Sequence, residues 1–293
     1  MSIVNALTID VEEYFHPSEV QRFVGMNRWS SLPSRVERET GEVLELLAKH
    51  SVQATCFILG WVAERYPELI KRIAAAGHEI GCHSYAHQLV YDLTPQQFKA
   101  DTQRALAVIA DATGEVPKSY RAPSYSVTER SLWALEILIE CGIKVDSSIY
   151  PIEHDRYGIP GFQRRAHTLQ TPSGPILEVP IATTQLSHGA LAPVGGGAYL
   201  RLLPYRYTAA GIRRINAREE QPACVYFHPW EIDPDHPRLA QGFAARLRTY
   251  SGLRGMRRKI ERLLTDFRFS TLASVYSPEK LAHEILVSGV AAS

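Results

Sequence analysis

The sequence is poor in cysteine, has no long apolar run and carries almost no net charge. Its four cysteines are scattered and form no CxxC pair, which argues against a disulfide framework and against a cysteine-based zinc module. No uninterrupted apolar stretch is long enough to span a bilayer. The formal net charge is +1 over 293 residues, so no basic field indicates a nucleic-acid partner. We therefore expect a globular protein with reduced thiols.

The amino terminus lacks the basic start and the longer apolar core of a secretory signal, since residues 1–10 read MSIVNALTID. A cytoplasmic protein is the expectation. Internal repeats and low-complexity segments are absent too. The chain does have a hydrophobic fraction of 45% and a charged fraction of 22%, which suit one large α/β barrel or two ordinary domains.

Short β-rich runs alternate with amphipathic helical stretches along the chain. Two helix starts have capping-box spacing, Ser34 with Glu37 and Thr94 with Gln97. Alternation at this pitch predicts a largely parallel sheet, and about seven strands favour a closed or nearly closed β/α barrel over an open sheet. The Pro- and Gly-rich segment 151–175 is expected to be a loop over the barrel mouth. Strands are expected at 6–11, 53–59, 79–82, 118–121, 143–146, 176–181 and 224–228, and helices at 34–49, 62–76, from 94 onward, and at 128–141.

Polar residues follow two of these strands, where β/α barrels place their active sites. Asp10 and Glu12 are two residues apart, so an extended backbone directs both carboxylates to one side. His83 and His87 are four apart, and a helical turn would put both imidazoles on one face. A carboxylate with two imidazoles suits Zn²⁺ or a similar divalent metal. Glu13 is a competing ligand, but on a straight strand it points away from Asp10.

The order of further motifs resembles the NodB-type polysaccharide deacetylases (carbohydrate esterase family 4). The resemblance spans about residues 5–230 and rests on five segments: Asp10-Val11-Glu12, the His83–His87 pair, Arg121-Ala122-Pro123, Val145-Asp146-Ser147 and Tyr226-Phe227-His228. Finer details look like the subgroup found with exosortase-associated exopolysaccharide systems. They are TIDVEEYF at 8–15, RAPSYS at 121–126, the glycines at 195–197 and HPWEIDP at 228–234.

The resemblance implies a distorted (β/α)7-type barrel, the NodB homology fold, at residues 1–235, with a helical extension at 236–293 packed on the barrel. It implies metal-dependent hydrolysis of the N-acetyl amide of an amino sugar, in a polysaccharide or its precursor, with release of acetate. The implied cofactor is a divalent metal, Zn²⁺ in the first place, with Co²⁺, Ni²⁺ or Mn²⁺ as alternatives. Partners would be an amino-sugar polymer or oligosaccharide precursor, and exopolysaccharide biosynthesis would be the setting.

Residue roles also follow from the resemblance. Glu12, His83 and His87 would hold the metal, with Asp10 as general base, Arg121 as its orienting partner and His228 as general acid. The Ser124 amide would help to bind the oxyanion, and Tyr125, Asp146, Tyr199 and Trp230 would lie on the substrate side. The chain departs from many relatives at Val11, Ser124 and Ile149, where they carry an aspartate, an aromatic residue and an acid. Three acids are therefore candidate partners of His228: Asp146, Glu178 and Glu231.

Other readings remain open from the sequence. A basic amphipathic stretch at 246–268 would suit weak contact with a membrane surface, and with it a deformylase or deacetylase of a lipid-linked sugar at the inner membrane face. The favoured interpretation of this stretch is a helix packed on the barrel. A catalytically silent carbohydrate-binding barrel and a purine-degrading amidohydrolase are further alternatives, and the number of subunits is not predicted.

Overall fold

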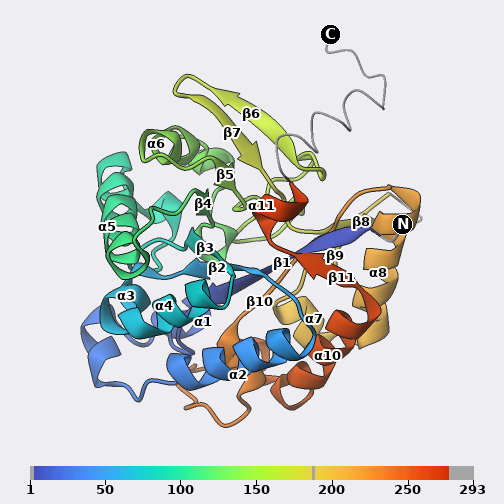
Figure 1. The fold of residues 1–293 in the computed structure, drawn as a ribbon, viewed down its shortest axis with the longest axis horizontal. Helices are drawn as coiled ribbons and strands as arrows, with labels where there is room; N and C mark the ends of the chain where they lie inside the picture. The colour runs from blue at the N-terminus through green and yellow to red at the C-terminus, as the bar shows by residue number, and fades with distance from the viewer. Residues whose placement is uncertain (1–2, 187–188, 277–293) are drawn as a thin grey trace.

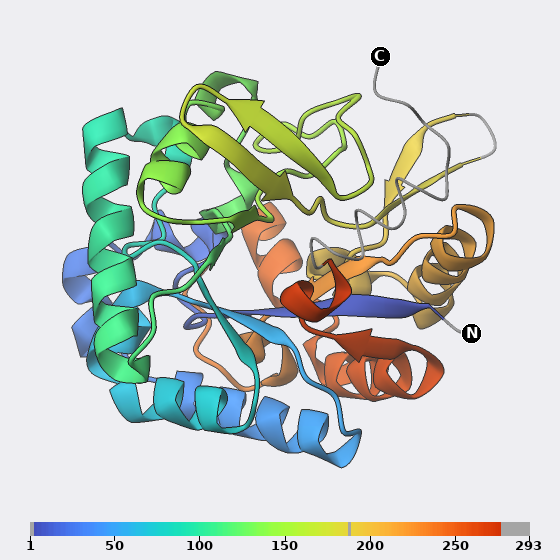
Figure 2. The same ribbon diagram turned by 45° about the horizontal axis from the view of Figure 1, so that its top comes forward.

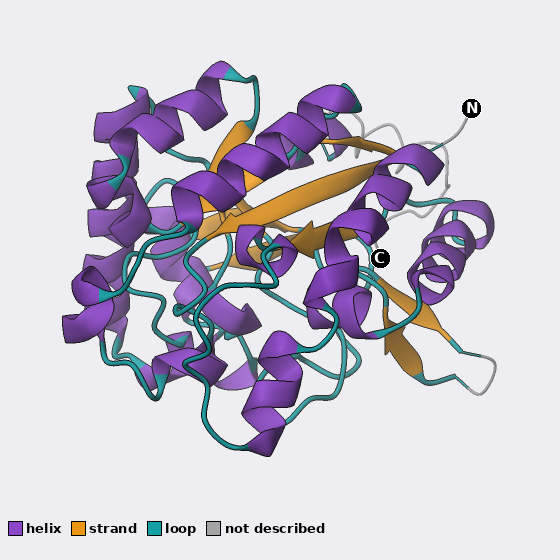
Figure 3. Ribbon diagram, turned by 90° about the horizontal axis from the view of Figure 1, so that it is seen from below, coloured by secondary structure: helices purple, strands orange, loops and turns teal. Residues whose placement is uncertain are grey.

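The structure is a computed structural model that describes residues 3–186 and 189–276. Its core is a sheet surrounded by helices (Figures 1 and 3). Within the described residues, no helix is both long and apolar enough to cross a membrane. All four cysteines carry free thiols, as the sequence predicted.

The main sheet is mixed, but every neighbouring pair from β10 to β7 is parallel, which confirms the predicted β/α class. Its strands are largely buried on both faces, as in sheets covered by crossover helices. In sheet order the strands are β10 (Cys224–Phe227), β1 (Val4–Val11), β2 (Thr55–Ile58), β3 (Glu79–Cys82), β4 (Ser119–Tyr120), β5 (Val145–Asp146), β7 (Gly174–Glu178) and β6 (His167–Thr171).

The barrel is distorted where β7 should meet β10. The chain leaving β7 bridges the gap, because Ile181 N donates to Ile149 O and Ala182 N donates to Cys224 O. A short parallel bridge joins Gly196 to Tyr226 on the same side. A Cβ on Gly196 would lie 1.8 Å from the Tyr226 carbonyl oxygen, so this close approach requires glycine. The predicted (β/α)7-type barrel is therefore closed by irregular backbone in place of a full strand pair.

Helices cover the outside of the sheet, with α5 and α2 among the longest (Figure 1). They are α1 (Ser18–Gln21), α2 (Val36–Lys49), α3 (Gly60–Arg65), α4 (Pro67–Ala75), α5 (Pro95–Thr113), α6 (Ala134–Glu140), α7 (Ala198–Leu202), α8 (Tyr205–Arg218), α9 (Phe243–Tyr250), α10 (Leu253–Asp266) and α11 (Leu272–Val275). Short 3-10 turns include η1 (Met26–Ser31), η2 (Val90–Asp92), η3 (Pro123–Tyr125), η4 (Glu129–Ser131) and η5 (Pro229–Ile232).

The two expected capping boxes have different outcomes. Thr94 caps α5 as predicted, with its side chain accepting from Gln97 N while Gln97 caps in return. Ser34 does not cap α2, because its hydroxyl donates to a Glu13 carboxylate oxygen and the helix starts one residue later. A tertiary contact has replaced the local one.

Two further expectations about local structure are wrong. The segment predicted as one helix at 62–76 is two, since Pro67 starts a new helix after Tyr66. The segment 151–175, predicted as loop, contains β6, which forms an antiparallel hairpin with β7 at the edge of the sheet (Figure 2). A second hairpin, β8 (Thr183–Gln185) with β9 (Leu191–Pro193), precedes α7.

The C-terminal extension predicted for 236–293 is helical in α9, α10 and α11, but it also contributes a strand, β11 (Arg268–Ser270). β11 pairs with β1 in parallel, so this segment belongs to the central sheet. The apolar side chains of α10 are buried, among them Met256, Ile260 and Leu263. This burial fits a helix packed on the barrel, while Leu247 of α9, in the same basic stretch, is 50% exposed. Residues 277–293 of the predicted extension lie outside the described residues.

Helix α2 buries an acid, Glu39, against the turn η5. Arg35 and Arg38 form ion pairs with Asp233 just after that turn, while Glu39 itself is fully buried. Burial, followed by the neighbouring Asp233, raises the pKa of Glu39 to about 9. The folded protein therefore holds a proton on Glu39 at neutral pH.

Removing this ionisable group should change the pH dependence of stability. In the unfolded chain the Glu39 carboxyl ionises near pH 4.5, so folding takes up a proton between about pH 4.5 and about pH 9 and wild-type stability falls as the pH rises. Glu39→Gln stays neutral and should be more stable than wild type by about 1–3 kcal/mol near the upper end of this window. Urea unfolding near both ends measures the difference, which should vanish near pH 4.5. Glu45→Gln, on the exposed side of α2, is the matched control, and equal pH slopes in all three proteins would contradict the account.

Candidate active site

A cavity of about 300 Å³ lies at the C-terminal ends of β1, β3 and β10. Barrels of this class carry their catalytic groups at that end of the strands. Of the residues predicted for the site, the structure brings nine to the cavity wall: Asp10, Glu12, His83, His87, Ser124, Tyr125, Tyr199, His228 and Trp230. Arg121 lies directly behind this wall, and Asp146 does not reach it.

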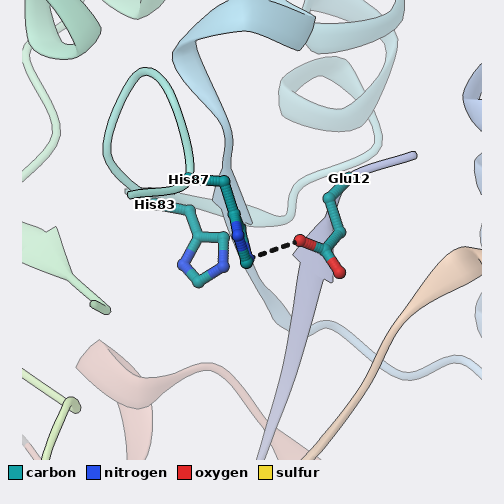
Figure 4. A group of neighbouring side chains, drawn as sticks. All are labelled: Glu12, His83 and His87. Carbon is teal, nitrogen blue, oxygen red and sulfur yellow. Dashed lines mark ion pairs between the residues drawn. The ribbon is translucent and has the colours of Figure 1, made fainter. Parts of the chain in front are cut away.

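Glu12, His83 and His87 form a buried cluster whose candidate ligand atoms all lie within 4.8 Å of one another. The Glu12 carboxylate and the His87 ring point toward each other, with Oε2 and Nε2 2.9 Å apart, and His83 lies beside them (Figure 4). Glu12 Oε2 is fully buried and faces His87 Nε2 as its polar partner. A buried carboxylate oxygen facing two imidazoles is the donor set that a divalent metal ion would satisfy.

Neighbouring groups orient two of the three candidate ligands, His83 and Glu12. His83 Nδ1 lies 2.8 Å from the Arg121 carbonyl oxygen, which fixes the proton on Nδ1 and leaves Nε2 for a metal. Burial lowers the pKa of His83 to about 4, so the ring is neutral at pH 7, as a ligand must be. The Trp230 indole donates to Glu12 Oε1 at 3.1 Å, which turns Oε2 toward His87. Burial alone would raise the pKa of Glu12, but the adjacent His87 and His228 hold it well below its usual range.

The segment between the two histidines is a loop, so the expected helical turn is wrong. Ser84 and His87 have φ of 61° and 50°, in the left-handed region that non-glycine residues seldom adopt. Asp101 of α5 holds the loop, because its carboxylate accepts from the backbone N–H groups of Tyr85 and Ala86. The HxxxH spacing therefore predicted the right pair of residues, although the backbone between them is a loop and not a helical turn.

Glu13, the competing ligand, faces away from the cluster. Its carboxylate accepts from Ser34 Oγ and from Arg35 N at the start of α2. Glu12 and Glu13 are thus both buried acids, one at the cavity and one beneath α2.

Arg121 is fully buried and binds Asp10 from behind. Its Nη1 donates to Asp10 Oδ1 at 2.8 Å and to Thr8 Oγ1 at 2.7 Å, while Nη2 donates to Ser147 Oγ at 2.9 Å. Burial opposes the charge of the guanidinium, yet Asp10 keeps the pKa of Arg121 raised above its ordinary value. Asp10 is thereby held in one orientation, with Oδ2 toward the cavity and 3.8 Å from His228 Nε2.

Of the three acids considered as partners of His228, Glu231 is the one in contact. Its Oε2 lies 3.0 Å from His228 Nδ1 and accepts from His228 N at 3.0 Å. Burial would lower the pKa of His228, but the hydrogen bond and charge of Glu231, with help from Glu12 and Asp10, raise it to about 9. The imidazole is therefore a cation at neutral pH, and its Nε2 faces Asp10 and Glu12 at 3.8 Å.

Asp146 and Glu178 have a different role from the one expected. Asp146 is fully buried and accepts from Ser148 Oγ at 2.6 Å, and Ser148 Oγ accepts from Ala122 N in the RxP segment. Burial raises the pKa of Asp146 and, together with the charge of Asp146, that of Glu178. Placing Asp146 on the substrate side was wrong, because its carboxyl supports the backbone behind the cavity.

Aromatic side chains form the rest of the wall. Tyr125 packs against Tyr226 with ring centroids 5.0 Å apart, and Ser124 and Tyr125 both have positive φ, so the turn after Pro123 presents tightly curved backbone to the cavity. The Tyr199 hydroxyl lies 3.3 Å from that of Tyr157. Trp230 stacks on His228 at 5.2 Å, in addition to its bond to Glu12.

Sequence reasoning missed several residues of the mouth and of the support behind it. Arg156 and Glu19 form an ion pair across the mouth, and His154, which was given no role, stacks on Tyr157. These residues come from α1 and from the predicted mouth loop, and no motif marks them. Arg201 also lines the cavity, where it binds Glu231.

The fold and the site together define a β/α barrel with an arginine-bound aspartate, a candidate metal cluster and a carboxylate-bound histidine around one cavity. Two family models match the chain. Residues 32–145 match the model described as "Polysaccharide deacetylase", and residues 147–277 match "Domain of unknown function (DUF3473)". The candidate ligands His83 and His87 lie in the first match, and His228 lies in the second.

Curated relatives match over part of their length. A peptidoglycan-N-acetylglucosamine deacetylase of Bacillus cereus is 35% identical over 33% of this chain and 36% of its own. A peptidoglycan deacetylase of Helicobacter pylori is 35% identical over 36% of both chains. A chitooligosaccharide deacetylase of Bradyrhizobium sp. is 31% identical over 34% of this chain and 43% of its own. The matched region thus spans about a third of the length of the first of these relatives.

Among solved structures, a candidate polysaccharide deacetylase from Mycobacterium smegmatis aligns with a TM-score of 0.62 at 19% identity, over 99% of this chain and 92% of its own. This likeness shows that the described part of the chain shares its fold with that structure. Residues 32–145 match the polysaccharide deacetylase model, in agreement with the family that the motifs predicted, and the solved structure shares the fold.

Replacing each of the two adjacent glutamates by glutamine in a separate variant tests which of them binds a metal. Glu12→Gln replaces the carboxylate that faces the histidines and should abolish stoichiometric binding of Zn²⁺. Glu13→Gln keeps an acceptor for Ser34 and Arg35 and should bind Zn²⁺ as wild type does. Calorimetric titration of the metal-free proteins gives both stoichiometries, and loss of binding in Glu13→Gln alone would contradict the assignment.

Proposed function

We propose that this chain hydrolyses the N-acetyl amide of an amino sugar, in a polysaccharide or its precursor, to acetate and a free amine. One observation carries the proposal. Asp10, bound by Arg121, and His228, bound by Glu231, face the Glu12–His83–His87 cluster across a single cavity. A base, an acid and a metal ligand set in one place suit hydrolysis better than binding alone.

The chemistry explains why all these groups are needed. An amide is a poor electrophile with a poor leaving group, so its hydrolysis needs an activated water, a stabilised oxyanion and a proton for the departing nitrogen. Glu12, His83 and His87 would hold a divalent metal, Zn²⁺ in the first place, and such an ion lowers the pKa of water toward neutrality and polarises a carbonyl group.

The residues of the chain supply the proton transfers. Asp10, oriented by its hydrogen bond from Arg121, would take the proton of the attacking water. His228, kept protonated by Glu231, would give a proton from Nε2 to the amine nitrogen as the C–N bond breaks. Its side chain is 18% exposed, toward the cavity, so it can reach a substrate while Glu231 cannot.

Backbone and aromatic groups would orient the substrate. The amide of Ser124, in the tight turn after Pro123, is our candidate oxyanion donor beside the cluster. Tyr125, Tyr199 and Trp230 would form the walls for the acetyl group and the sugar ring.

The amino sugar class is supported by the relatives, whose names specify peptidoglycan N-acetylglucosamine and chitooligosaccharides. A role in exopolysaccharide biosynthesis and a location in the cytoplasm are further parts of the proposal. The role in exopolysaccharide biosynthesis rests on the motifs shared with the exosortase-associated subgroup.

Acetate release tests the proposal directly. Wild-type protein loaded with Zn²⁺ should release acetate from N-acetylglucosamine oligomers, and a chelator should stop the reaction until metal is restored. His83→Ala should lose the bound ion on elemental analysis and lower acetate release by more than about a hundredfold. His167→Ala, a histidine of β6 remote from the cluster, should match wild type in both respects.

Two results would contradict the proposal in different ways. A protein that binds no divalent metal after reconstitution would exclude the mechanism and favour the silent binding barrel. Bound metal without acetate release would retain the metal site and exclude N-acetylated oligomers as substrates, which would direct the search to formylated or lipid-linked sugars.

A further inference from the structure

His228, the proposed acid, begins a buried chain of contacts that continues through Glu231 to Arg201 in α7. Arg201 Nε donates to Glu231 Oε1 at 2.9 Å, and the other oxygen of Glu231 holds His228 Nδ1 at 3.0 Å. Arg201 and Glu231 are 2% and 0% exposed, so neither charge is screened by solvent. The Glu231 carboxylate therefore has two partners, with Arg201 at Oε1 and His228 at Oε2.

Arg201 is itself fixed by the C-terminal segment. Its two terminal nitrogens donate to the carbonyl oxygens of Arg248 and Ser251, at the end of α9. A Cβ on Gly252, whose φ is +81°, would lie 2.4 Å from the Arg201 carbonyl oxygen, so the contact requires glycine there. Lys259 of α10 donates to the same carbonyl oxygen. The segment after the barrel thus surrounds α7 on the side that carries Arg201.

We propose that Arg201 is a positioning residue for the reaction: it acts through Glu231 to hold His228 with Nδ1 on the carboxylate and Nε2 toward the cavity. This inference rests on the proposed function. It assigns a task to the segment matched by the domain of unknown function, which carries His228, Glu231, Arg201 and the carbonyl groups that hold Arg201.

The physical reason lies in the two oxygens of Glu231. Without Arg201, Oε1 of the buried Glu231 carboxylate would lose its charged partner, and the group would be free to rotate about its last torsion. Arg201 occupies Oε1 and so leaves Oε2 for the imidazole. The planar guanidinium does this while also meeting two carbonyl groups, which an ammonium group cannot reproduce in the same geometry.

Leaving-group dependence separates this role from a merely structural one. Hydrolysis of an N-acetyl amide needs a proton on the departing nitrogen, whereas an aryl acetate releases a phenolate that needs none. Glu231→Gln should lower kcat on N-acetylglucosamine oligomers by about a hundredfold and change kcat/KM on 4-nitrophenyl acetate by less than about threefold. Arg201→Lys should show the same selective loss to a smaller degree, with KM for the oligomer unchanged.

Arg213→Lys changes an exposed arginine of α8 and should leave both activities at wild-type values. If the Arg201 variant loses amide and ester hydrolysis together, Arg201 supports the fold alone and the proposal is overturned. Unchanged amide hydrolysis in that variant overturns it as well.

A spectroscopic readout keeps the inference testable without turnover. A histidine Nδ1 proton bound to a buried carboxylate resonates far downfield, and ¹⁵N labelling identifies it as an imidazole proton. We expect this signal in wild type, its loss in Glu231→Gln and a clear shift in Arg201→Lys. An identical signal in wild type and Arg201→Lys would overturn the inference. If the wild-type protein does not hydrolyse the oligomers, the proposed function is overturned. The imidazole proton signal of His228 then tests the positioning role of Arg201 independently.

Discussion

A buried guanidinium, that of Arg121, joins the parts of the molecule on which the site depends. The guanidinium bonds to Thr8 and Asp10 of β1 and to Ser147 after β5. The backbone carbonyl oxygen of Arg121 holds His83. A buried, unpaired charge would be costly, on the order of several kcal/mol, so each of these partners has to be in place when the protein folds. The fold and the proposed chemistry are therefore linked, because Arg121 fixes both Asp10, the proposed base, and His83, one of the candidate metal ligands.

The acid side repeats this arrangement with different residues. Arg201 holds His228 through Glu231, and Arg121 holds Asp10 directly. Both arginines are buried. Arg121 belongs to the first matched segment and Arg201, Glu231 and His228 belong to the second, while Asp10 lies on β1, which precedes both and pairs with β10. The chain after residue 147 is thus needed to complete the cavity, and β11 ties its far end back to the same strand.

Much of this could be predicted from the sequence, because strand ends and short spacings are local signals. The Asp10–Glu12 pair, the histidines and the RxP arginine all lie at or just after the C-terminal ends of predicted strands, and the structure places them at one cavity. Local signals failed where a distant group competed: Ser34 bonds to Glu13 and does not cap α2, and the His83–His87 loop depends on Asp101 of α5. The choice of Glu231 over Asp146 and Glu178 needed three-dimensional placement, since all three are buried acids near the site. Arg201 had no sequence signal, because its partners are Glu231, thirty residues away, and two backbone carbonyls.

The central claim is that Glu12, His83 and His87 hold one divalent metal ion between the aspartate and the histidine that move protons. Crystals of the protein reconstituted with Zn²⁺, measured on both sides of the zinc absorption edge, test it most directly. The account predicts one strong anomalous peak within bonding distance of Glu12 Oε2 and of the Nε2 atoms of both histidines. A peak at other residues, or no peak in this cavity at full reconstitution, would contradict it.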